Sequence, residues 1–439
     1  MKSSSTKIKL TIDTPLIISV LLLVIIGILS IYSANIMKSP QYQVKYLRQL
    51  IFLAIGIALF FMFLSFKYQT LSQYWFFYLI GSVIILLFTL VFARKIHNSR
   101  SWVFILGQGI QPSEIIKIFT ILLLAKYLDN LGKKITKFKW LLSAILICMP
   151  IVGLILVQPD FGTALMYFPI IFTMIFVAGA DKVHVLLLFV TGLMGLGIPL
   201  LTYYIGEILH KQDNVLLIFN KIPVTLITAC ILACISGILF LLFKRFKEKV
   251  FKTIMMVCIC LALGLALSVV TKQVLKKHHY ERFLAFVDKK RIDPRGAGWN
   301  IQQSLTAIGG GEFNGQGWLK GNQKNGGFLP ASDTDFIFSV IAEEWGFRGS
   351  LVVFILFMII IYRGVTIIFN AKDMLGSLIA TGITSMFFFH IVVNLGMAVG
   401  IMPVIGVPLP FLSYGGSFFI TCLAAAGLLL NVEMRKYVY

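Results

Sequence analysis

The sequence has 439 residues, of which 58% are hydrophobic and 13% are charged, and its formal net charge is +21. An ordinary soluble chain has about 25% charged residues, so this composition excludes a string of water-soluble domains. The six cysteines fall inside apolar runs without the spacing of a zinc site, which excludes a secreted disulfide scaffold. Nucleic acid is not an expected partner, because no soluble basic domain is present to bind it.

Apolar stretches of about 20 residues recur along the chain, and each is long enough to cross roughly 30 Å of hydrocarbon as a helix. We therefore predict an all-α polytopic membrane protein, a bundle of about 12 transmembrane helices. The predicted spans are 15–34, 49–66, 73–93, 114–130, 140–157, 162–180, 184–205, 223–243, 253–271, 336–362, 375–399 and 414–432.

The distribution of lysine and arginine predicts the orientation of these spans. If the N-terminus is cytoplasmic, the inside segments carry 18 Lys and Arg and the short outside segments carry 8, so both termini are predicted to be inside. The one large loop, 272–335, is then outside and carries ten more basic residues. These include Lys276, Lys277, Arg282, Lys289, Lys290, Arg291 and Arg295. The loop is either a solvated basic surface or one that attracts phosphate at the outer leaflet.

A charged side chain inside the hydrocarbon costs about 2.5–3.5 kcal/mol, so such residues indicate functional sites. The first such region is 98–117, where Glu114 and Lys117 stand three residues apart on a helix that Pro112 can start. Two interpretations stay open. The pair clamps two spans together, or Arg100 and Lys117 face a polar cavity open to the outer leaflet.

The second region is Gln-Pro-Asp-Phe-Gly-Thr at 158–163. Its proline and glycine end one helix and start another, and the dipole of the new helix favours a carboxylate at Asp160. Asp160 is thus either a helix cap or part of the architecture of a site.

The third region is 296–349. Its glycine run, 309–321, permits tight turns against a surface or a ligand, but it lacks the GxxxxGK[ST] motif of a phosphate loop. Thr334 and Asp335 precede an apolar helix, where either can act as an N-cap or Asp335 can serve a reaction. Further on, Glu344 and Arg348 have the i,i+4 spacing of a helical ion pair.

The fourth region, 394–417, contains three prolines between 403 and 410, which forbid a continuous helix. The segment is apolar, so we expect it to dip into the outer leaflet and line a groove. Non-helical backbone at that depth requires cover by protein or by a water-filled cavity.

These four regions, in this order, resemble the SEDS family of bacterial cell-wall proteins (shape, elongation, division and sporulation), and its elongation members more than its division members. The matching stretches are QPSEIIK (111–117), QPDFGTALM (158–166), GAGWNIQQSLTAIGGGEFNGQGWLKGNQ (296–323), FLPASDTDFIFSVIAEEWGFRGS (328–350) and NLGMAVGIMPVIGVPLPFLSYGGS (394–417).

The chain departs from the family pattern at three places. Ala331 and Asp333 stand where the family usually has Glu and His, and Phe418 replaces a second serine. The usual fold has ten spans, so residues 223–271 are predicted to be a two-helix insertion in a single transmembrane domain, 1–439.

The resemblance implies polymerisation of lipid II, a disaccharide peptide on undecaprenyl pyrophosphate, at the outer face of the bacterial cytoplasmic membrane during elongation. Asp335 would be the general base of an inverting transfer, its proton affinity raised by desolvation and by Asp333. A divalent cation, Mg or Mn, could share the charge of the diphosphate, although the sequence shows no committed metal site. The apolar segment 403–411 would hold the polyprenyl tail. The expected substrate-binding residues are Arg100, Lys117, Glu114, Asp160, Arg282 and Ser413.

The resemblance also implies partners. These are a class B penicillin-binding transpeptidase, docked on the later spans and the outer loop, and other membrane proteins of the elongation complex. Three alternatives remain. They are a lipid II flippase without bond chemistry, a scaffold that only recruits the transpeptidase, and a division or sporulation paralogue with the same activity.

Overall fold

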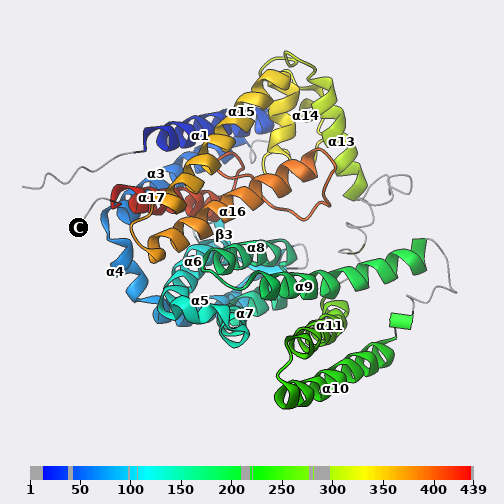
Figure 1. Cartoon of the computed structure of the whole chain (residues 1–439). Helices are drawn as coiled ribbons and strands as arrows, with labels where there is room; N and C mark the ends of the chain where they lie inside the picture. The colour runs from blue at the N-terminus through cyan, green and yellow to red at the C-terminus, as the bar shows by residue number, and fades with distance from the viewer. Residues whose placement is uncertain are drawn as a thin grey trace, which may run out of the picture. The chain divides into compact units, whose positions relative to one another are not determined.

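The computed structural model describes residues 13–37, 43–96, 99–105, 107–208, 218–219, 221–275, 280 and 297–436. The chain forms two compact units (Figure 1). The first consists of Met1–Gly179 with Ile292–Tyr439, and the second of Ala180–Arg291.

Each of the twelve predicted spans coincides with a helix, and ten helices among the described residues are long and apolar enough to cross a membrane. The other two are α6, which carries four charged residues, and α8, which has 17 residues. The predicted all-α polytopic membrane fold is thus confirmed, while the number and orientation of the spans stay predictions. The helices are α1 (Thr14–Asn35), α3 (Lys45–Ser65), α5 (Trp75–Phe92), α6 (Pro112–Leu131), α7 (Phe138–Val157), α8 (Phe161–Val177), α9 (Lys182–Tyr203), α10 (Ile222–Phe246), α11 (Lys249–Val274), α15 (Ile337–Asn370), α16 (Met374–Ala398) and α17 (Gly416–Met434).

Shorter elements connect these helices. A three-stranded antiparallel sheet lies between α5 and α6, with Val103 opposite Ile110, and it was not predicted from the sequence. The short elements are α4 (Tyr68–Gln73), β1 (Arg94–Ile96), β2 (Ser99–Ile105), β3 (Gln108–Ile110), η1 (Gly132–Thr136), η2 (Tyr204–Ile208), α13 (Ala297–Gly310) and α14 (Asn322–Asn325).

Helices α16 and α17 form the core of the first unit, since 78% and 89% of their spans are buried. Helix α16 packs against α15, α8 and α6, and α17 packs against α3 and α6 (Figure 1). The α17–α3 contact is close, because a Cβ at Gly427 would lie 2.5 Å from the Phe60 carbonyl oxygen. Polar side chains on α16 and α17 are therefore held in fixed positions by packing on several sides.

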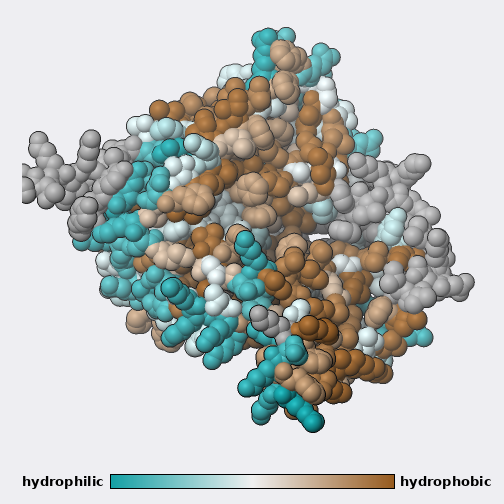
Figure 2. All heavy atoms as spheres, viewed as in Figure 1, coloured by the Kyte–Doolittle hydropathy of each residue, from teal (hydrophilic) through white to brown (hydrophobic). Residues whose placement is uncertain are grey.

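The second unit contains α9, α10 and α11, with α11 packed against both of the others. Thr191 Oγ1 donates to the Cys260 carbonyl at 3.2 Å and links α9 to α11. Only 11% of the α10 span is buried within the structure. Figure 2 shows hydrophobic atoms over the pair α10 and α11 at the lower right. The predicted insertion, 223–271, comprises α10 and α11, and its status as an insertion stays a prediction.

Helix α15 is interrupted at Gly346, where φ is 65° and ψ is −160°. The glycine-rich loop packs into this break: Gln316 N–H donates to the Glu343 carbonyl and Phe347 N–H donates to the Glu312 carbonyl, both at 2.9 Å. A Cβ at Gly346 would lie 2.3 Å from the Gly315 nitrogen. The glycines therefore let the loop backbone come close to another surface, as the sequence predicts. That surface is helix α15.

The expected Glu344–Arg348 ion pair is wrong, because the break at Gly346 lies between the two residues and removes the helical spacing. Glu344 instead forms a buried ion pair with Lys324 of α14 and accepts a hydrogen bond from Ser33 Oγ of α1 at 2.6 Å. The Arg348 guanidinium lies over the Phe313 ring, 4.8 Å from its centroid.

We expect Gly346→Ala to destabilise the protein by about 1–3 kcal/mol or more, because alanine pays a backbone cost at this φ and its Cβ meets the loop backbone. The midpoint of thermal unfolding in detergent should fall. Gly153→Ala is the matched control, since a Cβ in this α7 helix meets no atom within 4 Å. Equal midpoints for the two variants would contradict the strain argument.

Candidate functional site

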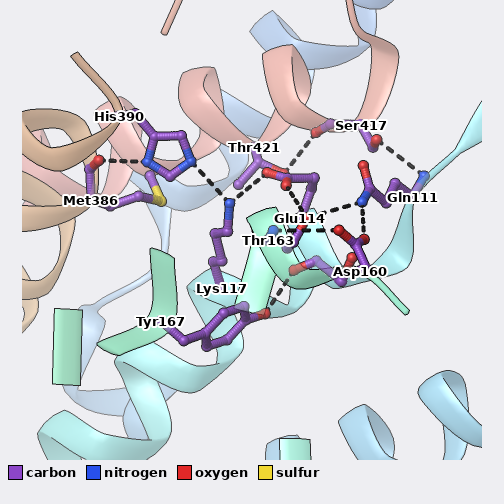
Figure 3. Close-up of polar contacts among 11 residues, drawn as sticks. Gln111, Glu114, Lys117, Asp160, Thr163, Tyr167, Met386, His390, Ser417 and Thr421 are labelled. Carbon is purple, nitrogen blue, oxygen red and sulfur yellow. Dashed lines mark hydrogen bonds and ion pairs between the residues drawn. The ribbon is translucent and has the colours of Figure 1, made fainter. Parts of the chain in front are cut away.

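The first polar cluster lies at the start of α6, where Lys117 Nζ is 2.8 Å from Glu114 Oε2 and the Lys117 side chain is 0% exposed. The same ammonium is 3.0 Å from His390 Nε2 on α16 (Figure 3). It also lies 5.5 Å from the centroid of the Phe418 ring on α17. The ion-pair interpretation of the sequence is the one observed. The ion pair itself lies within α6, the ammonium reaches α16 through His390, and it does not face an open surface.

Asp160 belongs to the same network. Its Oδ1 accepts the Thr163 N–H at 3.3 Å, so it caps α8 as the sequence suggests. Gln111 Nε2 donates to the other carboxylate oxygen of Asp160 and, at 3.1 Å, to Thr163 Oγ1. Thr163 Oγ1 in turn is 3.5 Å from Glu114 Oε1 (Figure 3). Asp160 therefore caps α8 and also belongs to the hydrogen-bond network that joins α6 to α8.

The cations expected to bind phosphate are Arg100, Lys117 and Arg282, and the structure describes the first two. Arg100 lies on β2 with an exposed side chain, and its N–H donates to the Gln158 carbonyl at 3.2 Å. Lys117 is buried and paired. Arg282 lies outside the described residues, as do the six other loop cations named with it.

Asp335 lies in the loop before α15. The N-cap of that helix is Phe336, without a side-chain hydrogen bond, so the N-cap interpretation of Thr334 and Asp335 is wrong. Asn394 Nδ2 of α16 donates to the Asp335 carbonyl at 2.9 Å and to the Val407 carbonyl at 2.7 Å. The backbone of Asp335 is thereby tied to the proline-rich segment.

Ser413 makes a second tie between the same two segments. Its Oγ donates to the Thr334 carbonyl at 2.7 Å and accepts the Leu409 N–H at 2.8 Å. The side chain is 1% exposed. Its hydroxyl therefore holds the loop next to Asp335, and a role in substrate binding stays a prediction.

Asp333 is ion-paired with Lys45 at the start of α3 and accepts from Asn35 Nδ2 at 3.4 Å. The Lys45 ammonium also lies 5.1 Å from the Tyr414 ring centroid, and Arg48 lies beside the same phenol. The negative charge of Asp333, expected to act on Asp335, is compensated by Lys45. That expectation stays a prediction.

The segment 401–415 is non-helical, as its prolines predict. It lies between Asp335 and the start of α8: a Cβ at Gly406 would be 3.6 Å from Asp335 Oδ2, and a Cβ at Gly162 would be 2.4 Å from the Ile405 carbonyl oxygen. Three regions that are far apart in sequence thus meet at one place. Most apolar side chains of the segment are buried, namely Val404, Val407, Leu409, Phe411 and Leu412.

In the described part of the chain, no three His, Cys, Asp or Glu side chains come together in a group that could hold a metal ion. Magnesium is often bound through one or two carboxylates together with substrate phosphates. A divalent cation at this site would be held in that way, with the diphosphate supplying the remaining oxygens.

Several polar residues of the site were not identified from the sequence. Lys45 and Arg48 were counted only for orientation, although two cations three residues apart at the start of a span are a signal. His390 also carries a signal, because it lies in an apolar span four residues before Asn394, on the same helix face.

Removing one partner of the buried Glu114–Lys117 pair should lower the free energy of unfolding by about 3–5 kcal/mol, because the remaining charge is left uncompensated. We expect Glu114→Gln and Lys117→Met each to lower the unfolding midpoint in detergent. The double variant should be more stable than the sum of the single effects predicts, because it buries no lone charge. Additive effects in this double-mutant cycle would show that the pair contributes no coupling.

The chain matches known proteins over nearly its whole length. The family model of the FtsW, RodA and SpoVE cell cycle proteins matches residues 13–222 and 215–438. The chain is 34% identical over 426 residues to the peptidoglycan glycosyltransferase RodA of Treponema pallidum (strain Nichols), covering 97% of this chain and 98% of that protein. It is 30% identical to the stage V sporulation protein E of Bacillus subtilis (strain 168), covering 96% of each.

Solved structures agree with this assignment. A chain of a peptidoglycan synthase complex that coordinates polymerisation and crosslinking superposes with a TM-score of 0.68 at 27% identity, covering 98% of this chain and all of that one. The rod shape determining protein RodA of Thermus thermophilus superposes with a TM-score of 0.60 at 25% identity, covering 98% and 99%. The resemblance seen in the motifs is confirmed, and the chain belongs to the FtsW, RodA and SpoVE family of cell cycle proteins, the SEDS family.

Proposed function

We propose that this chain is a peptidoglycan glycosyltransferase that polymerises lipid II at the outer face of the cytoplasmic membrane, with Asp335 as the general base. The class of enzyme follows from the family and from relatives that carry this name, including the RodA of Treponema pallidum. Elongation duty is proposed from the same relative and from the motifs between 296 and 350.

The observation that carries the proposal is the position of Asp335. Its backbone is fixed by Asn394, the residue is partly exposed, and a Cβ at Gly406 would lie 3.6 Å from its carboxylate oxygen. Gly406 adds no side chain of its own beside the carboxylate, and the loop carrying Asp335 lies against the proline-rich segment. A base in an inverting transfer must lie within hydrogen-bond reach of the acceptor hydroxyl, and a carboxylate held in a fixed, partly exposed loop suits that role.

The leaving group is a lipid diphosphate, whose developing charge requires cationic partners. Arg100 is exposed and is the first candidate, and Arg282 remains in the proposal from the sequence. Lys117 can contact phosphate only if its ammonium leaves Glu114 and His390. We assign Glu114 and Asp160 to the support of this region, because they join α6 to the start of α8.

The proposed partner is a class B penicillin-binding transpeptidase, since a similar chain is part of a complex that coordinates polymerisation with crosslinking. We propose that it docks on α15, α16 and the outer loop. Copurification with such a partner provides the material for the decisive assay.

That assay separates the glycosyltransferase from a flippase and from a scaffold. The purified complex in detergent receives lipid II, and glycan polymer is measured on gels. Detergent leaves no membrane to cross, so a flippase or a scaffold would yield no polymer. Polymer from the wild-type complex supports the proposal, provided that the transpeptidase alone makes none.

Asp335→Asn should reduce polymerisation by about 100-fold or more, because it removes the proton acceptor and keeps the size of the side chain. Asp181→Asn is the control, since this carboxylate caps α9 by accepting the Val183 N–H at 2.9 Å. The control should retain activity. An Asp335→Asn complex that polymerises as fast as the wild type would show that another group is the base.

Arg100→Ala should reduce turnover about tenfold while the amount of folded protein stays the same, because an exposed cation adds little to stability. Arg94→Ala, on the neighbouring strand and also exposed, is the matched control. Abundance and activity are measured in parallel. If abundance falls in step with activity, Arg100 has a structural role instead.

A further inference from the structure

One buried titratable group has no part in the proposed reaction. His390 lies on α16 with 1% of its surface exposed. Its Nδ1 is 2.8 Å from the Met386 carbonyl oxygen and its Nε2 is 3.0 Å from Lys117 Nζ. The ring stacks on Phe418 with centroids 4.9 Å apart and planes at 20°. The imidazole is therefore fixed on both ring nitrogens and on one face.

These contacts determine where the protons are. A carbonyl oxygen can only accept, so Nδ1 of His390 carries a proton and donates it to Met386. Its Nε2 then offers a lone pair to the Lys117 ammonium, which also donates to Glu114. A second imidazole proton on Nε2 would set two donors against each other at 3.0 Å. The arrangement holds a neutral imidazole, one ammonium and one carboxylate.

We propose that His390 is a positioning residue for the transferase, whose neutral imidazole holds the Lys117 ammonium against Glu114. The inference rests on the proposed function and deepens it, because it assigns a residue that acts through others. Phe418 supports the same geometry, since its ring packs on the imidazole and lies 5.5 Å from the ammonium.

Two paths connect this contact to Asp335. Along α16, His390 lies one turn before Asn394, which holds the Asp335 backbone. Through α8, Glu114 contacts Thr163, and the neighbouring Gly162 packs on the Ile405 carbonyl. That segment faces the Asp335 carboxylate at Gly406. Loss of the His390 acceptor would therefore disturb the geometry around the base without removing any group that touches substrate.

The test compares His390→Gln with His390→Leu in the purified complex with its transpeptidase. Glutamine can donate to Met386 and accept from Lys117, whereas leucine can do neither. We expect His390→Leu to lower kcat about 10–100-fold with little change in KM for lipid II, because the site is misaligned but still binds. His390→Gln should recover most of that loss. Ser385→Ala is the control, since it removes an α16 side-chain hydrogen bond to the Pro169 carbonyl.

A second measurement reads the proton arrangement directly. Nitrogen-15 spectra of protein labelled at its six histidines, with His390→Gln used for assignment, should show a neutral His390 protonated on Nδ1. A ring protonated on Nε2 would overturn the inference, as would wild-type kcat in His390→Leu or equal losses in both variants. If the wild-type complex makes no polymer, the proposed function fails, and the spectra still decide the His390–Lys117 contact.

Discussion

A lysine inside a membrane bundle must be paired where it lies, and the structure meets this constraint for Lys117 with Glu114 and His390. The pairing fixes which face of α6 points inward and which residues of α16 lie opposite. The start of α8 is then held against α6 by the contact of Thr163 with Glu114, and Asp160 caps the helix there. The buried charge thus specifies the arrangement of the polar site as well as its local stability.

The site near Asp335 depends on a different kind of contact. Its loop is held by hydrogen bonds from Asn394 and Ser413 to backbone carbonyls, so these bonds do not depend on the identity of the loop side chains. This explains how Ala331 and Asp333 can replace the residues usual in the family without loss of the loop. The new carboxylate at 333 is balanced by Lys45, from a different part of the chain.

The sequence predicted the spans, the Asp160 cap and the Glu114–Lys117 pair, because each of these depends on residues that are close together in the chain. The sheet was missed because two of its strands have three residues, too few for an alternating pattern. The Lys117–His390 and Lys45–Asp333 contacts join residues 273 and 288 positions apart, which no local spacing reveals. The Glu344–Arg348 prediction failed because helical periodicity was assumed across Gly346.

The break in α15 has a mechanical consequence. Backbone hydrogen bonds from Gln316 and Gly317 to the carbonyls of Glu343 and Glu344 join the glycine-rich loop to the first turns of this helix. The short helical piece between Ile337 and Gly346 is therefore bonded to the loop through its backbone, and Asp335 lies two residues before its first residue. A partner that displaced this loop would therefore also displace the start of α15, next to the Asp335 backbone.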